Sequence, residues 1–241
     1  MARKVQIVCA SMGFAFVVVL FGGIIVAGML PPFSPSAGAE EVAAWYQDNT
    51  NGIRFGMVLM MFGALMTAPW GALLAAHIKK VEGEFTPLTY TFLAATAAGC
   101  VAIFMPVMIF SAAAFRPERS AEITQTLNDM AWIPFIMNGP PAITQAIVLG
   151  AAILMDKRAR PAFPRWAGYY NFWVGFGFLP ACILLYFKSG PFAWNGVLSF
   201  WLAAVVFGTW FITMSILMLR ALPEREERPE TADDELILAA Q

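Results

Sequence analysis

Six long apolar stretches divide the chain, and short polar segments separate them. The middle of each stretch carries no charged residue. Each is long enough to cross a hydrocarbon layer of about 30 Å as a helix, which takes about 20 residues. A charge at mid-bilayer costs about 2.5–3.5 kcal/mol on insertion scales, so this spacing is typical of membrane spans. The predicted spans run roughly 5–30, 53–76, 88–114, 130–155, 166–187 and 194–219.

The pattern therefore predicts an all-α protein, a polytopic membrane bundle of six transmembrane helices within one domain, residues 1–222. The first connecting segment has a helical pattern of its own from Ala39, with Val42, Trp45 and Tyr46 on one face. We expect a short amphipathic helix there, lying in the headgroup layer. The remaining residues, 223–241, are rich in acidic side chains, and we expect a disordered cytoplasmic tail.

Basic residues are distributed unevenly over the segments between the spans. Of the 15 Lys and Arg residues, most lie in the segments that share a side with the N-terminus. The four on the opposite side are Arg54, Arg116, Arg119 and Lys188. Cytoplasmic segments of membrane proteins carry the excess of Lys and Arg. The chain is therefore predicted to have both termini in the cytoplasm.

Composition argues against several classes of chemistry. The chain is 59% hydrophobic and contains one histidine, His77, and three cysteines that all fall within the predicted spans. One histidine cannot supply a histidine-ligated metal cluster or a bis-histidine haem. No pair of intramembrane carboxylates is present for acid–base work or ion coupling, and no nucleotide-binding or hydrolase motif occurs. We expect no catalytic residues, no metal, no cofactor and no nucleic-acid partner.

Prolines interrupt four of the predicted spans, at Pro69, Pro106, Pro140–Pro141 and Pro180. Proline removes backbone hydrogen bonds, and the freed carbonyls need partners in protein or water rather than in lipid. Kinked helices with polar side chains at mid-depth often mark binding sites, although they also serve simply in helix packing. We predict a ligand pocket between the second, fourth and fifth spans. Its candidate lining residues are Thr67, Trp70, Asn138, Thr144, Gln145, Tyr170 and Asn171.

Three segments carry a resemblance to a known group. They are PPFSPSAGAEEVAAWYQDNTNGIRFG after the first span, FPRWAGYYNFW at the start of the fifth and GPFAWNGVLSFW at the start of the sixth. Together they resemble a family of uncharacterised bacterial six-span integral membrane proteins. The resemblance implies a bacterial inner membrane location for a multi-pass protein. It implies no activity and no functional residues.

Three functions remain open from the sequence. The first is a non-enzymatic membrane protein that binds or passes a small hydrophobic molecule in the predicted pocket. The second is an accessory or scaffold subunit of a larger redox or degradative membrane complex, with membrane lipids and other subunits as partners. A homo-oligomer is compatible with both, because small residues in the spans permit close helix approach. The third, an enzyme acting alone, lacks a catalytic constellation in the sequence.

Overall fold

A computed structural model describes residues 2–222, and within that range it contains helices and no strand. The tail expected at 223–241 lies outside the described residues. The elements are α1 (Ala2–Val26), α2 (Ala39–Asp48), α3 (Thr50–Glu82), α4 (Pro87–Phe115), α5 (Ala121–Ile136), α6 (Gly139–Met155), α7 (Arg165–Gly177), the 3-10 helix η1 (Leu179–Tyr186), the π-helix η2 (Val197–Leu202) and α8 (Ala203–Arg220).

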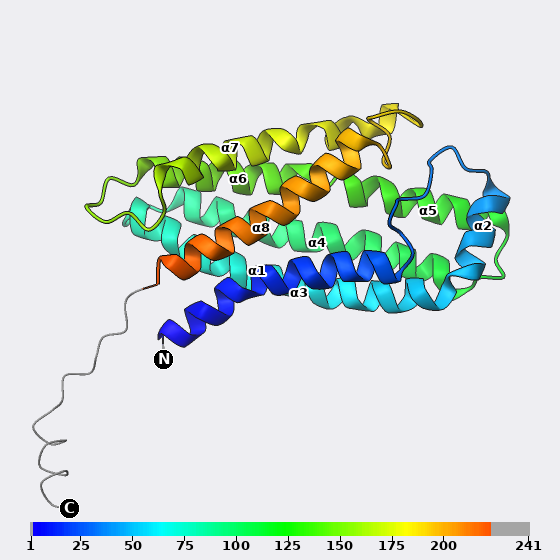
Figure 1. The fold of residues 1–241 in the computed structure, drawn as a ribbon, viewed down its shortest axis with the longest axis horizontal. Coiled ribbons are helices and arrows are strands. Elements are labelled where there is room, and N and C mark those ends of the chain that lie inside the picture. Colours follow the sequence, from blue (N-terminus) through cyan, green and yellow to red (C-terminus); the bar gives the residue numbers. More distant parts are fainter. Residues whose placement is uncertain (1, 223–241) are drawn as a thin grey trace, which may run out of the picture.

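Six helical segments of the described chain are long and apolar enough to cross a membrane, which confirms the predicted all-helical class and number of candidate spans. The six segments are Arg3–Val26, Thr50–Glu82, Pro87–Phe115, Ala121–Met155, Arg165–Tyr186 and Val197–Arg220. They form one elongated bundle. Helix α2 lies at one end of it, and the start of α1 and the last turn of α8 lie at the other (Figure 1). This architecture is that of a multi-pass membrane protein.

The fourth span is longer than the sequence predicts, because the helix begins at Ala121 rather than near residue 130. The additional turns are polar, and their side chains find partners on or near α2. Gln125 Nε2 donates to the carbonyl of Ala37 at 3.0 Å, and Tyr46 OH donates to Asn128 Oδ1 at 3.4 Å. Hydropathy does not detect a helix that is stabilised through polar contacts at the end of the bundle.

The short helix α2 covers that end. Its Val42 and Tyr46 are buried against the bundle, and the ring of Trp45 lies 5.0 Å from that of Tyr46. Burial in this apolar contact and a nearby carboxylate, that of Asp129, raise the pKa of Tyr46, so its hydroxyl stays protonated and able to donate. The placement of α2 in a headgroup layer stays a prediction.

Prolines act differently in the different spans. Both α3 and α4 continue as helices through Pro69 and Pro106. The fourth span is broken instead, since α5 ends at Ile136 and α6 starts at Gly139 with prolines in its first turn. A proline at a helix start lacks a donor that would have no intrahelical partner in any case, so Pro140 and Pro141 fit the start of α6. The break places Asn138 in the middle of the bundle.

Candidate functional site

Two neighbouring cavities lie at the level of the α5–α6 break, with volumes of about 100 Å³ and about 30 Å³. They share three lining residues, Ile103 of α4, Asn138 at the break and Phe207 of α8. These three side chains therefore form the wall between the two spaces. We refer to the two spaces as the large and the small cavity.

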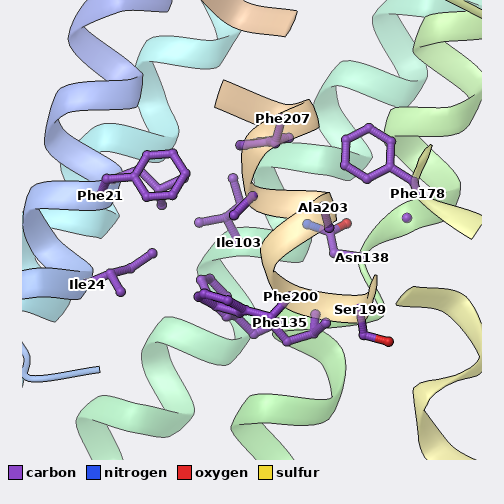
Figure 2. Close-up of a pocket in the computed structure, with 14 residues that line it drawn as sticks. Phe21, Ile24, Ile103, Phe135, Asn138, Phe178, Ser199, Phe200, Ala203 and Phe207 are labelled. Carbon is purple, nitrogen blue, oxygen red and sulfur yellow. The ribbon is translucent and has the colours of Figure 1, made fainter. Parts of the chain in front are cut away.

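The large cavity lies between α1 and α8, which diverge from each other over this part of the bundle (Figure 1). Figure 2 shows Phe21 and Ile24 approaching from α1, with Phe135, Phe200 and Phe207 on the other sides. The complete lining is Leu20, Phe21, Ile24, Ile103, Phe135, Ile136, Asn138, Gly139, Phe178, Ser199, Phe200, Ala203, Ala204 and Phe207.

Two polar side chains line this otherwise apolar space, and only one of them is already satisfied. Ser199 Oγ lies 2.8 Å from the carbonyl oxygen of Phe192 and 3.3 Å from that of Pro180, so its hydroxyl proton is used. Asn138 is different, because its Oδ1 is buried and has no hydrogen-bond partner among the described residues. An unsatisfied buried acceptor costs about 1–3 kcal/mol. A donor brought by a ligand would recover that free energy.

Apart from Asn138, the polar groups that line the small cavity already have hydrogen-bond partners. Gln145 Nε2 donates to Thr96 Oγ1 at 2.8 Å, and Thr96 Oγ1 in turn donates to the carbonyl of Phe92 at 2.8 Å. Thr67 Oγ1 donates to the carbonyl of Ala64 at 2.7 Å. The Gln145–Thr96 bond joins α6 to α4, and such interhelical bonds hold spans together. These hydrogen-bonded side chains therefore form a wall next to the large cavity.

Trp70 completes this wall and connects it to α8. Its side chain is fully buried, and its Nε1 donates to Ser215 Oγ at 3.0 Å. Its ring lies 4.2 Å from that of Phe211 and 5.3 Å from that of Trp210. The indole thus fixes one half of α8 against α3 next to the small cavity.

Four of the seven residues predicted for a site come together. Thr67, Trp70, Asn138 and Gln145 line the small cavity, and Asn138 also lines the large one. The elements around the small cavity are α3, α4, α6 and α8, and the fifth span contributes Phe178 to the large cavity. The other three predicted residues, Thr144, Tyr170 and Asn171, line neither cavity.

Each of those three has a different local environment. Asn171 is fully buried and links two helices, because its Oδ1 accepts from Trp210 Nε1 at 2.8 Å and its Nδ2 donates to the carbonyl of Ala167 at 2.7 Å. Thr144 Oγ1 donates to the carbonyl of Pro140 at 3.0 Å, within its own helix. The Tyr170 hydroxyl is buried with no partner among the described residues, away from both cavities.

Sequence reasoning did not identify Ile103, Phe178, Phe200 and Phe207 as lining residues. In a membrane span, the sequence does not distinguish an apolar residue that faces a cavity from one that faces lipid. The Thr96 partner of Gln145 offered a signal, since a polar side chain inside a span needs a partner. The assembled groups can bind a small molecule. They provide a shaped apolar space and one amide with an unused acceptor.

Among the described residues, no group of three or more His, Cys, Asp or Glu side chains could hold a metal ion. No protein-family model, curated protein or solved structure matches this chain. The resemblance to bacterial six-span proteins therefore stays a prediction.

Proposed function

We propose that this multi-pass membrane protein binds a small hydrophobic molecule carrying one hydroxyl group, held in the large cavity with the hydroxyl on Asn138. The observation that carries the proposal is the buried, unpartnered Oδ1 of Asn138 at a space of about 100 Å³ that is lined mainly by apolar side chains. A hydroxyl both donates and accepts, so it can pair with either end of an amide. Apolar pockets with a few polar groups are the usual profile of small-molecule sites.

The size of the cavity limits the ligand. An engineered apolar cavity of about 150 Å³ stays dry and takes up benzene. A space of about 100 Å³ with a neighbouring one of about 30 Å³ suits a single ring or a short branched chain, with modest side-chain movement. Phe207 and Ile103 separate the two spaces, so a rotamer change of either side chain would join them.

We propose lateral entry from the bilayer between α1 and α8, where the two helices diverge (Figure 1). The location proposed is a bacterial inner membrane, with both termini in the cytoplasm. Supporting this orientation, Arg3, Lys79, Arg158 and Arg220 belong to segments at the same end of the bundle, opposite α2. An excess of basic residues at one end is typical of the cytoplasmic side.

The test compares two fluorinated probes on protein in phosphatidylcholine nanodiscs. 4-Fluorobenzyl alcohol carries the hydroxyl and 4-fluorotoluene lacks it, and ¹⁹F NMR measures the binding of each above that of empty nanodiscs. One net hydrogen bond contributes about 1 kcal/mol, so we expect the alcohol to bind about fivefold more tightly than the toluene. Asn138→Leu, which keeps a similar side-chain shape, should remove this preference.

The matched control is Thr144→Val, a change in the same helix at a residue that lines neither cavity. It should leave the preference for the alcohol intact. Equal binding of both probes by the unaltered protein, or a preference that survives in Asn138→Leu, would contradict the proposal.

A second function, that of an accessory subunit in a larger membrane complex, is favoured by one surface. The exposed side of α7 carries Trp166, Tyr169, Trp173 and Phe176 at helical spacing, along one stripe. Aromatic residues are enriched at protein interfaces. We expect a partner subunit or a second copy to cover this stripe. Light scattering in mild detergent should then give a mass above that of one chain if the partner is a second copy. Trp173→Ala should reduce that mass, whereas Phe55→Ala, at an exposed ring of α3, should not. The mass of a single chain for the unaltered protein would exclude a second copy as the partner.

A further inference from the structure

A second concave surface lies at the end of the bundle opposite α2. This basic pocket has a volume of about 390 Å³. Three segments form it, namely the end of α3, the connection between α6 and α7, and the end of α8. The lining residues are His77, Lys80, Arg158, Arg160, Pro161, Ala162, Arg220 and Ala221. Four cationic side chains thus line one pocket, and no carboxylate of the described residues 2–222 lines it.

Only one of these four cations is neutralised within the described part of the chain. Arg158 Nε and Nη2 donate to the two carboxylate oxygens of Asp156 at 2.8 Å and 2.6 Å. The Asp156 side chain is 4% exposed and that of Arg158 is 38% exposed, so the carboxylate is covered while the guanidinium still reaches solvent. The hydrogen bonds from Arg158 hold the pKa of Asp156 below its usual range. This bidentate pair fixes the orientation of Arg158 at the pocket wall.

The other three cations, Lys80, Arg160 and Arg220, make no ion pair in the described range. Converging like charges repel each other, and an anion placed among them would relieve that repulsion. The ring of His77, 5.0 Å from that of Phe163, also lines the pocket. Its Nδ1 is buried and has no hydrogen-bond partner in the described residues. The pocket therefore combines three uncompensated cations with an unused polar atom.

We infer that the basic pocket binds an anionic phosphate group, carried either by a lipid headgroup or by free phosphate. Guanidinium groups match the geometry of phosphate oxygens, and basic pockets at the cytoplasmic ends of spans hold anionic headgroups. The general excess of basic residues on one side of a membrane protein accounts for the number of these cations. It does not account for their convergence, because Lys79 and Lys157 belong to the same end and do not line the pocket.

The test uses the full-length protein in a non-ionic detergent. Native mass spectrometry measures the binding of dioleoylphosphatidylglycerol, which is anionic, and of dioleoylphosphatidylcholine, which is neutral overall. Calorimetric titration measures the binding of inorganic phosphate. The pocket variant is Arg160→Gln with Arg220→Gln, and the control is Lys79→Gln with Lys157→Gln. The control removes the same charge from the same end and leaves the pocket lining unchanged. All four residues are exposed, and thermal unfolding without any probe verifies that both variants fold.

Each basic residue near an anionic headgroup contributes about a fivefold gain in affinity. The pocket variant should therefore lose about 25-fold in affinity for its anion, and the control less than threefold. Tight binding of phosphatidylglycerol alone identifies a lipid headgroup, and binding of inorganic phosphate identifies the free ion. The inference is overturned if neither phosphatidylglycerol nor inorganic phosphate binds, or if phosphatidylglycerol binds no better than phosphatidylcholine and inorganic phosphate does not bind. It is also overturned if the pocket and control variants lose affinity equally.

Discussion

Helix α1 packs against two neighbours in opposite ways. Towards α3 the contact is made by backbone, since a Cβ added to Gly56 would collide with the carbonyl oxygen of Gly23 in α1. It would also lie 3.0 Å from the backbone nitrogen of Ala27, the residue after that helix. Towards α8 the contact is made by side chains, with Ser215 Oγ against Gly13 and aromatic rings further along the helix. Phe16 lies 4.6 Å from Phe211 and 5.6 Å from Phe207, measured between ring centroids. The large cavity begins beyond these rings, along the same helix.

This difference shows how a bilayer protein can keep an internal space without losing its fold. Lipid provides no hydrophobic drive for helix association, so close packing of small residues carries much of the attraction between spans. The α1–α3 contact supplies that packing, and α6 repeats it against α7, where a Cβ on Gly150 would lie 2.9 Å from the carbonyl oxygen of Gly168. The α1–α8 contact is then free to remain looser.

The largest expected effect comes from separating α1 and α3. In Gly56→Ala the new methyl group would collide with the backbone of α1. A backbone inside a packed helix cannot move aside as the end of a flexible side chain can. We expect a loss of about 3 kcal/mol in the free energy of unfolding, at the upper end for overpacking. Steric-trapping measurements in bicelles would detect it.

The control for this prediction is Gly22→Ala, because nothing lies within 4 Å of a Cβ added there. Alanine is favoured over glycine inside a helix by about 0.5–1 kcal/mol, so this variant should be unchanged or slightly more stable. Equal losses of unfolding free energy in Gly56→Ala and Gly22→Ala would contradict the close packing of α1 against α3.

A smaller effect is expected at the attachment of α8 to α7. Asn171→Leu removes the acceptor for Trp210 Nε1 and leaves that donor buried in the core. We expect a loss of about 1–2 kcal/mol, because hydrogen bonds between spans contribute about that much in model systems. The comparison variant is Thr209→Val, at an exposed neighbour whose hydroxyl bonds only within α8. It should stay within about 0.5 kcal/mol of the unaltered protein, as surface substitutions usually do.

The smallest change in stability is expected where the packing is loose. Ala203→Leu adds methyl groups into the large cavity, so it should raise the free energy of unfolding by about 0.5–1 kcal/mol, as cavity filling commonly does. It should also abolish binding of 4-fluorobenzyl alcohol in nanodiscs. Val205→Leu, on an exposed side of the same helix, should change neither quantity. A destabilised Ala203→Leu variant that still binds the probe would mean that the cavity is not the binding space.

The number of spans could be predicted from the sequence because lipid imposes one rule on every spanning helix, an uncharged centre of sufficient length. The extension of the fourth span back to Ala121 could not, since Gln125 and Asn128 are polar and bond to Ala37 and Tyr46, which lie far away in the sequence. The local sequence shows that a residue is polar and lies within a span, but it does not show which way the side chain points. Asn138 and Asn171 are alike in sequence, yet one lines the cavities and the other bonds to Trp210. Their difference depends on rotation of one helix against another.

Helix α2 has a consequence for how molecules could arrive at Asn138. It closes one end of the bundle, and Gln47 Nε2 adds a hydrogen bond to the carbonyl of Pro117 at 3.1 Å. Under the proposed lateral entry, occupancy at Asn138 follows the amount of compound dissolved in the bilayer. Two compounds of equal shape but different oil–water partition coefficients would then saturate the protein at very different aqueous doses.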